Sequence, residues 1–401
     1  MTAALSGITI VDMTQGVSGP FATRLLAQLG ARVIKIERPG GGDIVRFWDD
    51  IVHGMCSGHA WVNPGKESIA LDLGAERGRE ILFDLAAKAD VVIENFVPGT
   101  LEKWGITYQH LSKRNPGLIF CRISGFGQDG PYRDRSALDL IIQGEAGLIM
   151  TNGAPEEPAK ISLSVCDISG SMYSAISILT ALFHRQATGK GQKIEVALLD
   201  AVMTWTGYFP YMYWYRNSVP ARVGLHHHTM TPYGPYAASD GRMVIVAAGS
   251  GHRALWEKFC LAIERPDIVD HPDYATNALR LEHRAQLDEI VSVAIGARDR
   301  DYWLARFHEF GIPSGALNDL ADALNHPRLK SRNLVREVDS VVGSVKVFDF
   351  PAEFSESQSV NRLGPPALGQ HTRSILTELG IDDAEISRLE ADKIVEGWGN
   401  E

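Results

Sequence analysis

An aspartate precedes the longest apolar segment of this sequence. Asp167 lies in the run Ser164-Val-Cys-Asp-Ile-Ser-Gly170, and the apolar periodicity that follows predicts a helix from Ile168 to about Thr188. Aspartate is a favoured N-cap residue, so a purely structural role is the ordinary interpretation. The positive end of a helix also favours the ionised carboxylate, which is a potential nucleophile. The two roles are compatible, and the pattern alone leaves both open.

Histidines and cysteines are the other reactive side chains. Three histidines are consecutive, from His226 to His228, but consecutive residues do not easily point at one ion, and no acidic or cysteine partner has suitable spacing nearby. A surface loop is the ordinary interpretation of this triplet. Cys166 borders Asp167 without an evident base, so we expect a buried apolar role for it. We therefore predict no metal site.

A glycine-containing turn, Gly16-Val-Ser-Gly-Pro20, follows the first predicted strand, and Glu37 ends the second. A glycine turn and an acidic strand end also occur in dinucleotide-binding proteins. The turn lacks the G-x-G-x-x-G spacing, however, and Arg38 directly follows Glu37. These departures disfavour an NAD-dependent oxidoreductase.

The elements that position these residues alternate between strands and helices. One helix is expected after the turn Gly16–Pro20 and through Leu29, and another from Glu76 to Ala87. Strands are expected over residues 7–12, 31–37, 68–72, 90–94, 118–123 and 193–197. Such alternation predicts an α/β fold with a doubly wound, mainly parallel, Rossmann-like sheet, whose ligands bind beyond the carboxyl ends of the strands.

A smaller α+β domain is expected after this sheet. Residues 204–235 are rich in Tyr, Trp, His and Pro and predict an irregular connector, and a hairpin turning at Asp240-Gly241 opens the smaller domain over 236–329. The tail, 330–401, has strand-like and then helical patterns. We expect it to return to the large domain formed by 1–203.

Composition excludes several classes of protein. The formal net charge is −10 and no Lys/Arg-rich block occurs, which argues against a nucleic-acid partner. The first twelve residues lack the pattern of a signal peptide, and no segment approaches the ~20 apolar residues of a membrane span. The four scattered cysteines fit a reducing compartment. These features predict a cytoplasmic protein without a membrane partner.

Short motifs along nearly the whole chain resemble those of the family III CoA-transferases, which include formyl-CoA and carnitine CoA-transferases and the related α-methylacyl-CoA racemases. The motifs are Gly16-x-x-Gly-Pro20, Leu29-Gly-Ala-Arg-Val-Ile-Lys-Ile-Glu-Arg-Pro39, Asn63-x-Gly-Lys-x-Ser-Ile69, Glu94-Asn-Phe-x-Pro-Gly99, Ser124-Gly-Phe-Gly-Gln-x-Gly-Pro131, Thr188-Gly-Lys-Gly-Gln192, Pro232-Tyr-Gly-Pro235 and Gly311-Ile-Pro-x-Gly315. The resemblance implies an interlocked homodimer in which two ring-like chains thread through one another.

The resemblance also implies a mechanism and a coenzyme A site. Asp167 occupies the position of the family's catalytic aspartate, which carries a mixed anhydride and then an aspartyl-CoA thioester. Coenzyme A is a substrate, and no prosthetic group is expected. Its phosphates need backbone amides and cations. The candidate CoA-binding residues are Val17, Ser18, Arg38, Leu71, Asn95, Phe96 and Lys103.

The resemblance further implies succinyl-CoA as donor and a small dicarboxylate such as itaconate, citramalate, mesaconate or malate as acceptor. Candidate substrate contacts are His227, His228, Tyr233 and Gly249. Gly249 belongs to Ala247-Ala-Gly-Ser-Gly251, which is either a short lid over the intermediate or a strand-to-helix turn.

Two alternatives share the expected fold. Racemases of this family carry a histidine in a Gly-His-Asp stretch, where this chain has Ala137-Leu-Asp139; because Leu138 cannot accept a proton, racemase chemistry of that kind is disfavoured. Formyl-CoA transferase has a tyrosine at the same position, so formate and oxalate are also disfavoured as substrates. A non-catalytic CoA-binding protein is the second alternative.

Overall fold

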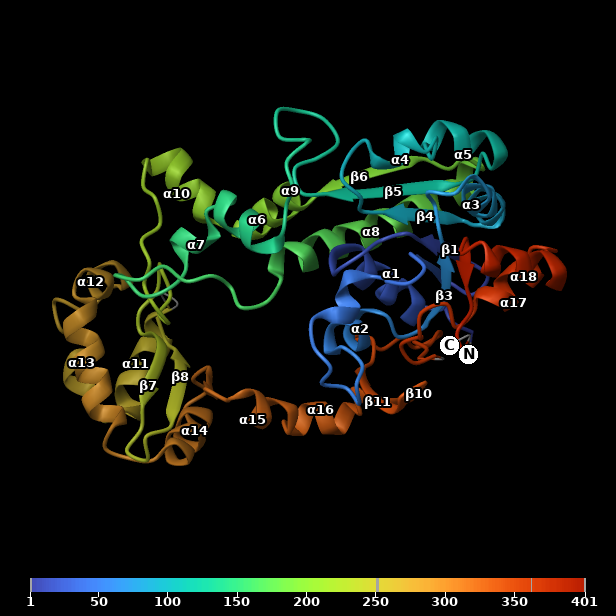
Figure 1. The fold of residues 1–401 in the computed structure, drawn as a ribbon. Coiled ribbons are helices and arrows are strands. Elements are labelled where there is room, and N and C mark those ends of the chain that lie inside the picture. Colours follow the sequence, from blue (N-terminus) through green and yellow to red (C-terminus); the bar gives the residue numbers. More distant parts are fainter. Residues whose placement is uncertain (1, 250–251, 362, 400–401) are drawn as a thin grey trace. The chain divides into compact units, whose positions relative to one another are not determined.

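The computed structural model describes residues 2–249, 252–361 and 363–399 (Figure 1). The chain divides into two compact units: residues 1–146, 162–207 and 328–401 form the first unit, and residues 147–161 and 208–327 form the second. The segment 147–161, which we expected in the large domain, therefore groups with the second unit. Part of the expected irregular connector is regular, because Phe209–Arg216 forms helix α10.

The first unit is built on a seven-stranded sheet in the order β12-β3-β2-β1-β4-β5-β6. All neighbouring strands pair in parallel except β12, which is antiparallel to β3. The expected mainly parallel sheet is thus confirmed. The strands are β1 (Thr9–Asp12), β2 (Arg32–Glu37), β3 (Lys66–Leu71), β4 (Val91–Glu94), β5 (Ile119–Ser124), β6 (Lys193–Ala197) and β12 (Val395–Glu396).

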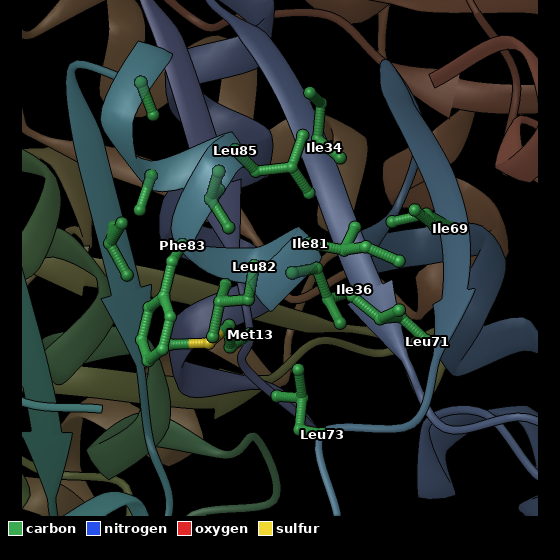
Figure 2. Close-up of a cluster of buried hydrophobic side chains, with 14 of the residues drawn as sticks. Met13, Ile34, Ile36, Ile69, Leu71, Leu73, Ile81, Leu82, Phe83 and Leu85 are labelled. Carbon is green, nitrogen blue, oxygen red and sulfur yellow. The ribbon is translucent and has the colours of Figure 1, made fainter. Parts of the chain in front are cut away.

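Helices cover this sheet. Helix α3 (Glu76–Lys88) packs Ile81, Leu82 and Leu85 into one apolar cluster with side chains of β2 and β3, as Figure 2 shows. Four more helices join the same cluster: α4 (Thr100–Lys103), α5 (Tyr108–Arg114), α17 (Thr372–Glu378) and α18 (Asp383–Ala391). Helices α1 (Ser18–Gln28) and α8 (Val165–Thr188) pack against each other and the sheet and contribute nothing to this cluster, as expected of helices on the other face.

The remaining elements of the first unit are short. They are α2 (Ser57–Val62), α6 (Asp139–Glu145), α9 (Leu198–Met203) and the antiparallel pair β10 (Val335–Ser340) and β11 (Gly343–Phe348). As expected, the tail returns to the first unit, since β12 lies beside β3.

The second unit has its own core. Strands β7 (Tyr233–Ala237), β8 (Met243–Ala247) and β9 (Ser314–Ala316) form an antiparallel sheet. The hairpin expected at Asp240-Gly241 is confirmed, with Gly241 at φ 76°. The helices are α7 (Leu148–Thr151), α10, α11 (Arg253–Ala262), α12 (Asn277–Glu282), α13 (Arg284–Ile295), α14 (Arg300–Glu309) and α15 (Leu320–Leu324), and α16 (Pro327–Arg332) begins at the boundary between units.

Helix α8 differs from the sequence expectation in two ways. It begins at Val165, with Ser164 as the N-cap residue, so the N-cap interpretation of Asp167 is wrong. It is also long and apolar enough to cross a membrane by length and composition alone, although we expected no such segment. Half of its most apolar window is buried and α8 packs against α1, as a core helix does.

Buried ion pairs link the first three strands to the glycine turn after β1. Lys66 pairs with Asp12 at 3.0 Å, and Lys35 pairs with Asp43 at 2.9 Å; all four side chains are fully buried. Asp43 also accepts a hydrogen bond from the Gly16 N–H at 2.9 Å, and Lys35 donates to the Thr14 carbonyl at 2.7 Å. These buried contacts hold the backbone of the glycine turn in place.

Candidate active site

The start of helix α8 presents the Asp167 side chain. Asp167 is the third residue of the helix and is half-buried. Asp139, the first residue of α6, accepts a hydrogen bond from the Cys166 N–H at 2.8 Å and another from Gln143 Nε2 at 2.6 Å. Asp139 thus caps helix α8 and brings a second carboxylate close to Asp167.

Burial raises the pKa of the Asp167 carboxyl to about 7, and the negative charge of Asp139 contributes to the same shift. The expectation that the helix end keeps this carboxylate ionised is therefore wrong in direction. The loss of hydration and the neighbouring carboxylate outweigh the helix dipole. Near neutral pH the protonated and ionised forms of Asp167 are both populated.

A cavity of about 900 Å³ lies at the carboxyl edge of the sheet. Each of the first four strands contributes residues that directly follow its end, as doubly wound sheets predict. These are Met13 and Gln15 after β1, Arg38 after β2, Asp72 to Gly74 after β3, and Phe96 after β4. The edge strand β12 and the turn before it complete the wall with Lys393, Val395 and Glu396.

Three of the seven candidate CoA-binding residues, Arg38, Leu71 and Phe96, line this cavity. Phe96 lies 6.5 Å from the Trp104 ring, edge to face, and both rings border the cavity. A flat base could pack against such a wall. Within the described ranges, Val17, Ser18, Asn95 and Lys103 do not contribute to the lining.

Asn95 and Ser18 instead join the cavity to helix α8. The side-chain amide of Asn95 donates to the Gln15 carbonyl at 2.8 Å and lies 3.3 Å from Ser18 Oγ. The hydroxyl of Ser171 lies 2.5 Å from the Ser18 carbonyl oxygen and 2.7 Å from that of Asp167. A continuous run of contacts therefore connects the cavity-lining Gln15 with Asp167.

The four candidate substrate residues all belong to the second unit. The His227 ring stacks on Tyr233 with centroids 4.8 Å apart, and the His227 carbonyl accepts from Arg284 at 2.7 Å. The His228 ring contacts Phe209 edge to face at 4.6 Å. Burial and the nearby Arg284 lower the pKa of both histidines, so near neutral pH they act as hydrogen-bonding groups rather than cations.

Gly249 approaches the backbone of Thr231 closely. A Cβ atom at this position would lie 2.4 Å from the Thr231 nitrogen, so only glycine fits. Close packing therefore gives a structural reason for this glycine. Ser250 and Gly251, the rest of the suggested lid, lie outside the described residues.

Sequence reasoning missed several residues of the site. Asp139 stands beside Leu138, which we considered only as a missing base. The available signal was the apolar run Leu140-Ile-Ile142 that follows Asp139. Leu138 itself is 73% exposed. Lys393 and Glu396 reach the cavity because a two-residue strand pairs with β3, and so short a strand leaves no recognisable pattern.

Comparison with known proteins agrees with this architecture. The model of CoA-transferase family III matches residues 5–372. The chain is 34% identical to the mouse (Mus musculus) succinyl-CoA:glutarate CoA-transferase over 98% of this chain and 90% of that protein. It is also 34% identical to the succinyl-CoA–L-malate CoA-transferase alpha subunit of Chloroflexus aurantiacus, over 98% and 92% respectively.

A solved structure shares the fold. The structure of a CAIB/BAIF family protein from Brucella suis superimposes with a TM-score of 0.83 at 34% identity, covering 94% of this chain and all of that chain. The family model, the relatives and the solved structure all span most of the sequence, so the similarity is not confined to the sheet. This chain belongs to CoA-transferase family III.

Proposed function

We propose that this CoA-transferase moves coenzyme A from succinyl-CoA to a small dicarboxylate, with Asp167 as the nucleophile. The observation that carries the proposal is the run of contacts from the cavity through Gln15, Asn95, Ser18 and Ser171 to Asp167. It runs from a pocket with a cationic and an aromatic wall to the main-chain carbonyl of Asp167, whose side chain is half-buried.

The reaction needs four acyl-transfer steps, and the Asp167 carboxylate takes part in each of them. The ionised Asp167 oxygen attacks the succinyl carbonyl, the C–S bond breaks, and CoA leaves as a thiolate from a mixed anhydride. The thiolate then attacks the Asp167 carbonyl, releasing succinate and leaving an aspartyl-CoA thioester. The acceptor carboxylate attacks this thioester, the C–S bond breaks, and CoA leaves again as a thiolate from a second anhydride. The returning thiolate attacks the acceptor's carbonyl, which yields the new acyl-CoA and restores Asp167.

The choice of substrates rests on the relatives' names and on the expected acceptors. Both relatives described above are named for succinyl-CoA as donor and for a dicarboxylate, glutarate or malate, as acceptor. This proposal also includes contacts of the acceptor with His227, His228, Tyr233 and Gly249. Incubation with succinyl-CoA and a panel of malate, glutarate, citramalate, mesaconate and itaconate, with products identified by mass, tests the choice.

The role of Asp167 is tested by Asp167→Ala. Exchange should fall by at least roughly 10³-fold because no other group takes over the covalent step, while CoA binding measured by calorimetry should persist. Asp200 is a matched control, since it is exposed in the first turn of α9, and Asp200→Ala should leave exchange unchanged. Undiminished exchange by Asp167→Ala would end the proposal.

Trapping in the wild-type protein separates the transferase from its alternatives. Hydroxylamine added during turnover should convert the aspartyl thioester to a hydroxamate on Asp167, which peptide mass analysis detects. A racemase would instead exchange an α-proton of its acyl-CoA without an acceptor acid, and a binding protein would do neither. The homodimer and the cytoplasmic location stay predictions.

A further inference from the structure

The cavity at the carboxyl edge of the sheet contains a cation that the motifs did not indicate. Lys393 lies in the turn between α18 and β12 and lines the cavity together with Arg38. The residues that the structure describes give neither of these two side chains an ion pair. Both are exposed toward solvent, so neither charge has yet been neutralised by the protein.

The backbone holds Lys393 at this place. Its φ of 58° lies in the left-handed region, which non-glycine residues adopt rarely. The Lys393 N–H donates to the Glu390 carbonyl at 3.0 Å, and the next residue, Ile394, accepts from the Asp72 N–H at 2.8 Å. The turn is therefore tied directly to the loop after β3, which forms another part of the cavity wall.

Of the four carboxylates that line the cavity, two pair with cations and two accept hydrogen bonds from backbone N–H groups. Glu37 pairs with Arg46 at 2.7 Å, and Glu390 pairs with Arg373. Asp72 accepts from the Gly74 N–H at 2.8 Å, and Glu396 accepts from the Gly40 N–H at 2.5 Å. In the described part of the cavity wall, Arg38 and Lys393 are thus the cations without an ion pair. An anion that enters the cavity would meet these two side chains.

We propose that Lys393 binds a phosphate group of the nucleotide end of coenzyme A, acting with Arg38. The inference rests on the proposed function, because it takes this cavity as the coenzyme A site. A lysine on a flexible stem suits a phosphate, with which it interacts as a point charge. In this arrangement β12 does more than extend the sheet, because the turn before it places the substrate-binding residue Lys393 in the cavity wall.

The test replaces Lys393 without disturbing the turn. Asparagine tolerates the left-handed conformation, so Lys393→Asn removes the charge and keeps the backbone. We expect the KM for succinyl-CoA and the Kd for CoA to rise roughly 10-fold, with little change in kcat, and Lys393→Arg to restore most of the affinity. Lys88→Asn is a matched control, because Lys88 ends α3 at the opposite edge of the sheet.

Substrates lacking the 3′-phosphate identify the group that is bound. If Lys393 contacts the 3′-phosphate, 3′-dephospho-CoA should bind wild type and Lys393→Asn equally; if it contacts the pyrophosphate, the variant should weaken both ligands. Both outcomes support the proposal. Wild-type affinity of Lys393→Asn for both ligands overturns it. That result leaves the proposed function intact if exchange through Asp167 persists, so the two failures are distinguishable.

Discussion

At the scale of single residues, the proposed mechanism depends on the protonation of Asp167. A nucleophilic carboxylate must be ionised, yet burial and Asp139 raise the pKa of this carboxyl to about 7. A higher pKa also makes the carboxylate a stronger nucleophile once it is ionised, because basicity and nucleophilicity rise together. Asp139 thus has two effects: it caps helix α8 through the Cys166 N–H and raises the pKa of the proposed nucleophile.

The pH dependence of the reaction follows from this pKa. Because only the ionised form attacks, kcat/KM should rise with pH through a midpoint near 7 and fall about tenfold per unit below it. Asp139→Asn keeps an oxygen for the Cys166 N–H but removes the negative charge. The pKa of Asp167 should then fall, and the midpoint should move to lower pH by roughly one unit.

Measuring kcat/KM from pH 5 to 9 for both proteins checks this prediction. The melting temperature of Asp139→Asn should stay near the wild-type value, which shows that the helix cap survives. Identical midpoints in the two proteins would mean that Asp139 does not act on Asp167 electrostatically.

At the scale of elements, buried charges hold the loops that form the site. Glu37 ends β2 and contacts Arg46 and Ser68 at 2.7 Å each. Burial alone would raise the pKa of Glu37, but Arg46, Lys35 and Ser68 lower it to about 2. A carboxylate buried in this way ties the end of β2, and with it Arg38, to the rest of the interior.

This lowered pKa predicts acid sensitivity. The ordinary value is 4.5 and the folded value about 2, so the stabilisation is complete above pH 4.5 and is lost as the pH falls toward 2. The shift corresponds to about 3 kcal/mol. Glu37→Gln should be less stable than wild type at pH 7, and the difference between the two proteins should shrink as the pH falls from 5 to 3.

Urea denaturation at several pH values measures this difference. Glu337→Gln is the control, since Glu337 is exposed on β10 and its loss should leave the pH dependence as it is in wild type. A stability difference between Glu37→Gln and wild type that is constant from pH 7 to 3 would contradict the prediction.

At the scale of the whole molecule, local periodicity predicted the helices and strands, and short motifs indicated the family and its candidate site residues. The family resemblance supplied Arg38, Leu71 and Phe96 as candidates, and the predicted strand ends accounted for their place at the carboxyl edge. The partner of Asp167 could not be found in this way, because the contact of Asp139 with Cys166 joins residues 27 positions apart through tertiary packing. Lys393 was missed for the same reason, since a register between distant strands brings it to the cavity.

The predicted homodimer also belongs to this scale. Helix α10 buries none of its residues, and Tyr211, Trp214 and Tyr215 are 58%, 66% and 79% exposed. Their rings contact one another, so they form a continuous aromatic surface rather than scattered positions. Surfaces of this kind are uncommon on monomers and frequent in interfaces, where Trp and Tyr contribute most of the binding energy.

We therefore expect sedimentation equilibrium to give a mass twice the 43.9 kDa of one chain. Trp214→Glu combined with Tyr215→Glu should shift the mass toward one chain, because two charges would be buried without partners. Tyr132→Glu is the control, since Tyr132 is a partly exposed tyrosine of the first unit whose loss should leave the mass unchanged. A wild-type protein that sediments as a single chain at micromolar concentration would refute the dimer, and an unchanged mass of the double variant would move the interface away from α10.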